Sequence, residues 1–516
     1  MFLYRVINHW DNMDGSVERG YAGRSIFFEG NRFLNNFSDI KKYASYLQSI
    51  NINTICLNNV NVNEVSAKLI TEEFLPDLAK VADIFRQHGI KLLIAIEFSA
   101  PKSLGGLDSC DPLDKSVCDW WKKQTDLIYK YIPDLAGFLV KADSEFRDGP
   151  AALGRTQADG ANCIARPLAP HDGVVFWRCF VYNCRQDWRD TKTDRAKAAY
   201  ETFMPLDGQF DDNVILQIKN GPMDFQVREP LSPLLGNMKN TRQALELQIT
   251  QEYTGQQIDI FSLASQWEDY FNSPINATEI LADKKFDAIC GVANVGRDTF
   301  LCGNPLAEAN LFAFGKFGDN PYSKACDIIN EWTDDQITRE ILMKSRDAYE
   351  GYTTPLGLGW MVTPHFHYGI SPLGYEFDKW GTYHRASHTH IGVDRSTRGT
   401  GFVSQYDPYL TELYDNPETT PEELLLFFHR LPYTYKMKDG RTLLEYLYDR
   451  HFEGYEAVES FIELWKKSNV NKDIYDEVAR RLELQKENAR EWRDVFNTFL
   501  YRMTGVCDEK GRKIYD

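Results

Sequence analysis

The sequence has no apolar run of about 18 residues, so we expect no segment that spans a membrane. It also has no CxxC pair, and its ten cysteines follow no regular spacing. Cys56, Cys179 and Cys290 lie inside apolar runs, which favours buried free thiols in a reducing cytosol over a disulfide framework. No signal peptide precedes the first strand-like run. These features predict a cytoplasmic protein.

Positive charge is also scarce, since 58 Lys and Arg residues face 75 Asp and Glu residues, for a formal net charge of -17. This balance argues against nucleic acid and against an anionic membrane surface as partners. It does not exclude an anionic small substrate, because the overall charge is screened beyond about 8 Å. The sequence has no Gly-rich dinucleotide or phosphate motif between a strand and a helix, so no cofactor is implied.

Strand-like and helix-like segments alternate through residues 1–300. This alternation predicts a parallel sheet, and its number and length match a (β/α)8 TIM barrel. A doubly wound sheet is the alternative. The expected strands are 4–10, 52–59, 91–98, 137–144, 174–181, 213–220, 244–252 and 288–295.

Helical patterns dominate after the last of these strands. We therefore predict a catalytic barrel over residues 1–315 and a mainly α-helical domain over 316–516. The exception is a loop over 355–408, rich in Gly, Pro, aromatic residues and His. No spacing of its histidines matches a known metal-ligand motif, so we predict no metal site and expect an ordered loop that reaches the barrel mouth. Its histidines are His365, His367, His384, His388 and His390.

The stretch 137–145 begins as a buried strand and ends in charge. If the strand continues, Lys141, Asp143 and Glu145 project on one face, because residues two apart share a face. Barrels and doubly wound sheets place their chemistry at the C-terminal ends of strands, so this charge indicates a site. An ion pair at a strand end is the alternative explanation.

Polar residues recur at this end of all the expected strands, which predicts an active site at one barrel mouth. In the seventh strand, polar residues alternate with Leu245, Leu247 and Ile249, and a barrel strand has no free face, so those polar groups need partners or a wet cavity. The strand-end residues include Trp10, Asn58, Glu97, Lys141, Glu145, Arg178, Lys219, Asp224, Glu252 and Asn294.

The carboxylates Glu145, Asp224 and Glu252 suit glycoside hydrolysis, in which one group protonates the leaving oxygen and another activates water or attacks carbon. The fourth and seventh strands are three apart in a ring of eight and face each other obliquely. That placement suits the inverting case, with carboxyl groups roughly 6.5–9.5 Å apart.

The cations Lys141, Arg178 and Lys219 are more than a neutral sugar needs, and they indicate an anionic substrate such as a uronic acid. Trp10 is placed to stack on a sugar face. Each residue also has a structural explanation. Arg178 and Lys219 could pair with glutamates of the seventh strand, Trp10 could belong to the core, and Asp224 could cap a turn. Glu97 is taken as structural.

Several long motifs, spread over nearly the whole chain, carry a resemblance to a known family. They are residues 9–25 (HWDNMDGSVERGYAGRS), 137–145 (GFLVKADSE), 186–190 (QDWRD), 217–226 (QIKNGPMDFQ), 248–257 (QITQEYTGQQ), 380–386 (WGTYHRA) and 392–395 (GVDR). These stretches resemble the α-glucuronidases of glycoside hydrolase family 67.

The resemblance implies an inverting hydrolase that removes α-1,2-linked glucuronic or 4-O-methylglucuronic acid from short xylo-oligosaccharides. By motif position Glu145 resembles the general acid of the family, and Asp224 and Glu252 resemble the pair that supplies the base. The uronate-binding residues would be Trp10, Lys141, Arg178 and Lys219. The family's fold is a barrel followed by a helical domain, and it is often dimeric, so a homodimer is expected.

The sequence departs from the family pattern at two places. The family usually carries an N-terminal α/β domain before the barrel, whereas this sequence starts at the first expected barrel strand. After Glu145 the family usually reads Gly-Gln-Pro-Gly-Pro, and here residues 146–150 read FRDGP, while Asp143 stands where Asn is usual. Two alternatives therefore stay open: a hydrolase of a different uronoside, or a non-catalytic barrel that binds acidic oligosaccharides. Retention of all three carboxylates weighs against the second.

Overall fold

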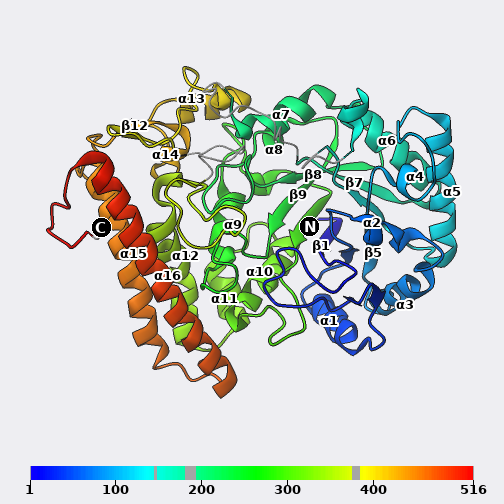
Figure 1. Cartoon of the computed structure of the whole chain (residues 1–516), viewed down its shortest axis with the longest axis horizontal. Coiled ribbons are helices and arrows are strands. Elements are labelled where there is room, and N and C mark those ends of the chain that lie inside the picture. Colours follow the sequence, from blue (N-terminus) through cyan, green and yellow to red (C-terminus); the bar gives the residue numbers. More distant parts are fainter. Residues whose placement is uncertain (1, 144–147, 181–192, 375–383, 515–516) are drawn as a thin grey trace.

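The computed structural model describes residues 2–143, 148–180, 193–374 and 384–514. Its centre is a closed barrel of parallel strands in the order β1-β10-β9-β8-β7-β6-β5-β4 (Figure 1), which confirms the TIM barrel and excludes the doubly wound sheet. The strands are β1 (Tyr4–Asn8), β4 (Thr54–Leu57), β5 (Lys91–Ile96), β6 (Gly137–Val140), β7 (Val174–Arg178), β8 (Val214–Lys219), β9 (Arg242–Gln248) and β10 (Ala288–Val292).

Most residues of the barrel strands are apolar because helices cover the outside and side chains fill the inside. β6 and β8 are buried along their whole length. Gly137 opens β6 with a φ of +137°, and a Cβ there would lie 1.8 Å from the carbonyl oxygen of Val174 on the neighbouring strand. Only glycine therefore lets β6 and β7 approach at this point.

The helices that surround the barrel present one apolar face to it. In α1 the buried residues Ile40, Tyr43, Ala44 and Leu47 follow the spacing of one helix face. The helices up to the end of the barrel are α1 (Ser38–Ser49), α2 (Glu64–Ala67), α3 (Leu75–Arg86), α4 (Ala100–Ser103), α5 (Lys115–Tyr131), α6 (Gln157–Leu168), α7 (Ala198–Phe203), α8 (Leu234–Asn237), α9 (Leu263–Asn272) and α10 (Glu308–Asp319).

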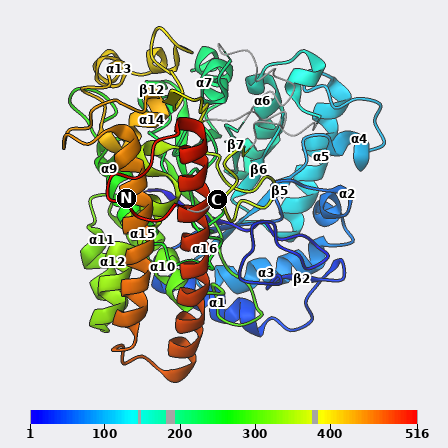
Figure 2. The same cartoon turned by 60° about the vertical axis from the view of Figure 1, so that its left-hand side comes forward.

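The C-terminal region is mainly helical, as expected. Figures 1 and 2 show α12, α15 and α16 as a layer of long helices beside the barrel. A single apolar core runs from the barrel strands into these three helices, so the division at residues 315 and 316 stays a prediction. The helices of this region are α11 (Ala325–Trp332), α12 (Gln336–Thr353), α13 (Pro408–Asp415), α14 (Leu425–Phe428), α15 (Leu443–Trp465) and α16 (Lys472–Thr504). Two short antiparallel strand pairs lie outside the barrel. They are β2 (Phe28–Glu29) with β3 (Arg32–Phe33), and β11 (His390–Ile391) with β12 (Leu431–Pro432).

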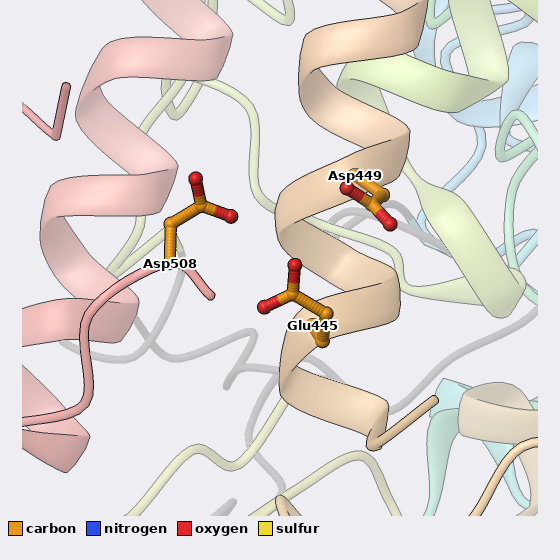
Figure 3. A group of neighbouring side chains, drawn as sticks. All are labelled: Glu445, Asp449 and Asp508. Atoms are coloured by element: carbon orange, nitrogen blue, oxygen red, sulfur yellow. The ribbon is translucent and has the colours of Figure 1, made fainter. Parts of the chain in front are cut away.

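The chain end is fastened to α15 through three carboxylates, Glu445, Asp449 and Asp508 (Figure 3). Their oxygens lie close enough to share a cation, but basic side chains already engage them. Asp449 accepts hydrogen bonds from Arg441, Lys510 and Arg512, and Arg512 also binds Asp508. The cluster is therefore a tether for the chain end rather than a metal site.

Among the described residues, no helix is both long enough and apolar enough to cross a membrane.

Candidate active site

Three of the cations expected at the barrel mouth converge on one aromatic ring, that of Phe180. The strand ends of β6, β7 and β8 supply Lys141, Arg178 and Lys219. Lys219 Nζ lies 3.2 Å from the centroid of the Phe180 ring, and Lys141 Nζ and Arg178 Cζ each lie 5.2 Å from it. Such contacts stabilise cations that have lost much of their hydration. The result is a buried group of cations around one aromatic ring.

Arg178 has the structural partner that was considered for it. Its Nε donates to the two carboxylate oxygens of Glu246 at 2.9 and 3.0 Å, and both side chains are almost completely buried. Its guanidinium also lies 5.0 Å from the ring centroid of Trp10. Trp10 is 6% exposed and belongs to the apolar core, which was the alternative considered for it. The ion pair fixes Arg178 between two aromatic rings, Trp10 and Phe180.

Asp224 lies in the turn after β8 and points to basic side chains. Lys219 Nζ donates to its Oδ1, Arg195 Nη2 is 3.4 Å from its Oδ2, and the Tyr253 hydroxyl donates to Oδ2 at 3.2 Å. Burial alone would raise the pKa of Asp224, but Lys219 and Arg195 outweigh it and hold the pKa well below its usual range. Burial lowers the pKa of Lys219 to about 8, although Asp224 opposes this shift.

Glu252 follows β9 and is buried among donors. Its carboxylate accepts from Arg19 Nε at 2.5 Å and from Gln248 Nε2 at 2.8 Å, and it lies 2.9 Å from His367 Nδ1. Burial would raise the pKa of Glu252, but Arg19 and His367 together hold it below its ordinary value. Glu252 is therefore ionised at neutral pH.

The two carboxylates are linked through a pair of stacked rings. Tyr253, which donates to Asp224, stacks on His367 with ring centroids 4.8 Å apart and an angle of 28° between the planes. His367 in turn contacts Glu252. The chain thus places two ionised carboxylates side by side at the mouth, each with its own basic neighbours.

The polar side chains that alternate with Leu245, Leu247 and Ile249 have partners, which is one of the two alternatives that the sequence left open. Glu246 pairs with Arg178, and Gln248 donates to Glu252. The Thr250 hydroxyl donates to the carbonyl oxygen of Arg19 at 2.5 Å. This polar row ties the loop after β1 to the end of β9.

The expectation for residues 141–145 was wrong in one respect. β6 ends at Val140, so the alternation of a strand does not continue beyond it. Lys141 donates to Asn61 Oδ1 at 2.7 Å, whereas Asp143, with a φ of +47°, accepts from the backbone N–H of Ala151 at 2.9 Å. Lys141 and Asp143 therefore serve different partners. Glu145 lies outside the described residues.

The His-rich loop reaches the mouth in the part of it that the structure describes. His367 contacts Glu252, and Trp360 lies 4.6 Å from the guanidinium of Arg195. His384 is instead a buried core residue whose pKa is lowered to about 4 by burial. The motif 186–190 and residues 380–383 lie outside the described residues.

Five residues of the site were not predicted individually from the sequence. Arg19 and Tyr253 lay inside recognised motifs, and His367 lay in the His-rich loop, so their motifs were the available signals. Phe180 and Arg195 carried no signal of their own. Arg195 is placed by Asp194, which caps the backbone N–H of Ala196 and is itself held by Arg395 at 2.8 Å. The five residues are Arg19, Phe180, Arg195, Tyr253 and His367.

Nearly the whole chain matches the models of one protein family. Residues 2–300 match the model of the glycosyl hydrolase family 67 middle domain, and residues 302–513 match that of the family 67 C-terminus. The chain is 42% identical over 533 residues to a probable alpha-glucuronidase A of Aspergillus flavus, and 41% identical over 534 residues to alpha-glucuronidase A of Aspergillus tubingensis. Each alignment covers 98% of this chain but 63% of the relative, so the chain spans less than two thirds of their length.

Among solved structures, a GH138 enzyme targeting pectin rhamnogalacturonan II is similar over 97% of this chain and 72% of its own, at 13% identity. Its TM-score of 0.48 carries no argument about function.

Proposed function

The chain belongs to glycosyl hydrolase family 67, and from this membership we propose that it is an inverting α-glucuronidase. Its substrate would be a short acidic xylo-oligosaccharide, cleaved at the α-1,2 bond between glucuronic or 4-O-methylglucuronic acid and xylose. The observation that carries the proposal is the buried group of cations around Phe180, next to two ionised carboxylates.

The cation group around Phe180 supports a uronic acid as the sugar that binds at the barrel mouth. Lys141, Arg178 and Lys219 are buried, so their attraction for a substrate carboxylate is little screened by solvent. Trp10 and Phe180 supply apolar faces against which a sugar ring can pack. Glu246 already pairs with Arg178 and Asp224 with Lys219, and the carboxylate of a uronic acid would add a further acceptor for these cations.

The state of the carboxylates supports hydrolysis with a separate acid. Asp224 and Glu252 are ionised, which suits the activation of water and does not suit protonation of a leaving group. A third carboxyl group must then protonate the glycosidic oxygen, and the family resemblance gives this role to Glu145. Water would attack carbon from the opposite face, and the anomeric configuration would invert.

The test is release of glucuronic acid from a reduced aldotriouronic acid by the wild type and by Glu145→Ala, with the product anomer followed by NMR. We expect β-glucuronate to appear first and its release to be lost in the variant. Tight binding of the aldouronic acid without release by the folded wild type would favour the non-catalytic binding barrel. Release from another uronoside alone would favour the different hydrolase.

We also propose that the protein works in the cytoplasm and as a homodimer. The first is supported by the cysteines that the structure describes, all of which are free thiols. The second rests on the family resemblance, and light scattering of the purified chain would test it.

A further inference from the structure

Glu229 is a buried carboxylate that the proposed chemistry does not use. It lies 2% exposed in the loop between β8 and α8, a few residues after Asp224. Its Oε2 accepts the backbone N–H of Met223 at 2.6 Å, and its Oε1 accepts those of Asp224 at 3.0 Å and Gln226 at 2.6 Å. Three backbone N–H groups of one turn therefore donate hydrogen bonds to a single side chain.

The turn is shaped to admit this carboxylate. A Cβ at Gly221 would lie 2.3 Å from Glu229 Oε2, so only glycine leaves room for it. Phe225 adopts a φ of +51°, a strained conformation for an aromatic residue. Burial raises the pKa of Glu229 to about 7, and the three backbone N–H groups oppose this shift because they favour the ionised form. Hydrogen bonds from these amides hold the carboxyl group and offset the strain.

The same turn carries Asp224 to its basic neighbours. The N–H of Asp224 is bound by Glu229 while its own carboxylate binds Lys219, Arg195 and Tyr253. Phe225, the next residue, lies with its ring 4.4 Å from Lys219 Nζ. A shift of the turn would therefore move Asp224 and disturb the surroundings of Lys219 together.

We propose that Glu229 is a positioning residue, whose carboxylate holds the 221–226 turn so that Asp224 keeps its place at the barrel mouth. The inference rests on the proposed hydrolase function, because it assigns Asp224 a part in the reaction. In the described structure Glu229 contacts neither the cation group around Phe180 nor Glu252. It acts through the backbone of the turn.

The test compares Glu229→Gln with a matched control, Asp207→Asn. In Glu229→Gln an amide N–H₂ replaces one acceptor oxygen and meets a backbone N–H, so the turn loses part of its hold. Asp207 precedes β8 and likewise accepts hydrogen bonds from backbone N–H groups, those of Lys239 and Asn240 in the loop before β9. This site lies at the end of the barrel opposite to the mouth. Each variant weakens the binding of backbone N–H groups by one carboxyl group, but only Glu229→Gln does so at the barrel mouth.

We expect kcat of Glu229→Gln to fall by about 10- to 100-fold, since displacement of a reacting group by about 1 Å costs that much. KM should rise by a smaller factor than kcat falls, because the turn contacts Lys219 whereas Lys141 and Arg178 lie at the ends of other strands. Asp207→Asn should keep the wild-type kcat. Glu229→Asp, which keeps the charge but shortens the side chain, should recover part of the activity.

Hydrogen exchange followed by mass spectrometry gives a readout that does not need turnover. Peptides covering 219–227 should exchange faster in Glu229→Gln, and peptides covering 248–257 should not change. Unchanged exchange at 219–227, a kcat within about twofold of wild type, or equal losses of kcat in both variants would overturn the positioning role. If the wild type releases no glucuronate but exchange at 219–227 rises, the hydrolase proposal fails while the structural hold on Asp224 stands.

Discussion

Asp224 and Glu252 are largely removed from water, yet basic side chains within hydrogen-bond reach keep each of them ionised. Different elements supply those neighbours: Lys219 ends β8, whereas Arg19 comes from the loop after β1. A substitution of one of these neighbours therefore acts first on one carboxylate, although the charge of Asp224 also raises the pKa of Glu252. This difference in neighbours offers a way to learn which of the two governs the reaction.

Arg19→Gln tests the part played by Glu252. Because Arg19 opposes the effect of burial, its loss should raise the pKa of Glu252, and the carboxylate should take up a proton at a higher pH than in the wild type. The acid limb of the kcat/KM profile should then move to higher pH, with a loss of about tenfold or more at its acid end. The measurement is kcat/KM for aldouronic acid hydrolysis against pH.

Arg24→Gln is the control, because Arg24 lies on the same loop but is exposed and pairs with Asp298 and Glu29. It should leave the profile unchanged. An acid limb that stays in place in Arg19→Gln would mean that a group other than Glu252 sets it.

At the scale of elements, the sequence predicted every barrel strand but placed several ends too late. The expected strand 244–252 ends at Gln248 in the structure, and 137–144 ends at Val140. Polar and apolar residues continue to alternate beyond the last ladder hydrogen bond, so the pattern cannot mark where pairing stops. Arg19 and His367 were beyond this kind of reasoning, because their contacts to Glu252 join residues far apart in the chain and follow no period.

The helix α16 holds the loop that follows Glu252. This loop contains consecutive residues with positive φ, Gly255, Gln256 and Gln257, of which the two glutamines are strained by about 1–3 kcal/mol each. From α16, Arg481 donates to the carbonyl oxygens of Gln257 at 2.5 Å and Gly303 at 3.0 Å. The C-terminal helices thus support the geometry of the barrel mouth.

Arg481→Met should therefore lower activity at a distance from the site. Loss of its hydrogen bonds leaves two buried carbonyl groups without this donor and lets the loop relax, so we expect kcat to fall by about tenfold and the thermal midpoint to drop. Arg480→Met on the same helix is the matched control, since Arg480 pairs with Glu477 on the surface. Equal effects of the two substitutions on kcat would show that α16 does not act through Arg481.

At the scale of the whole molecule, the barrel and the C-terminal helices share one apolar core, and the end of the chain returns to α15. The hydroxyl of Tyr448 donates to the carbonyl oxygen of Val506 at 2.9 Å, and the backbone N–H of Glu509 donates to Glu445 at 3.1 Å. Sequence periodicity predicted the long helices but not this return, because the segment after α16 has no regular structure and is held by charges.

Asp449→Asn tests how much this tether stabilises the protein. Asp449 is 1% exposed and binds Arg441, Lys510 and Arg512, so the substitution removes the negative charge and one of the two oxygens that these three cations share. We expect a loss of about 2 kcal/mol or more in the free energy of unfolding and faster proteolysis after α16. The exposed pair of Asp347 with Arg450 provides the control, and Asp347→Asn should cost less than about 1 kcal/mol.

The pH dependence of this difference has a definite sign. Burial opposes ionisation of Asp449, but Lys510, Arg441 and Arg512 together hold its pKa below the ordinary value. A depressed carboxyl pKa stabilises the folded state above the unfolded pKa of about 4, and that contribution disappears as the pH falls through the folded value. The stabilities of wild type and Asp449→Asn, measured by denaturant unfolding, should therefore converge below about pH 4. A gap that stays constant as the pH is lowered well below about 4 would mean that Asp449 contributes through packing rather than through its charge.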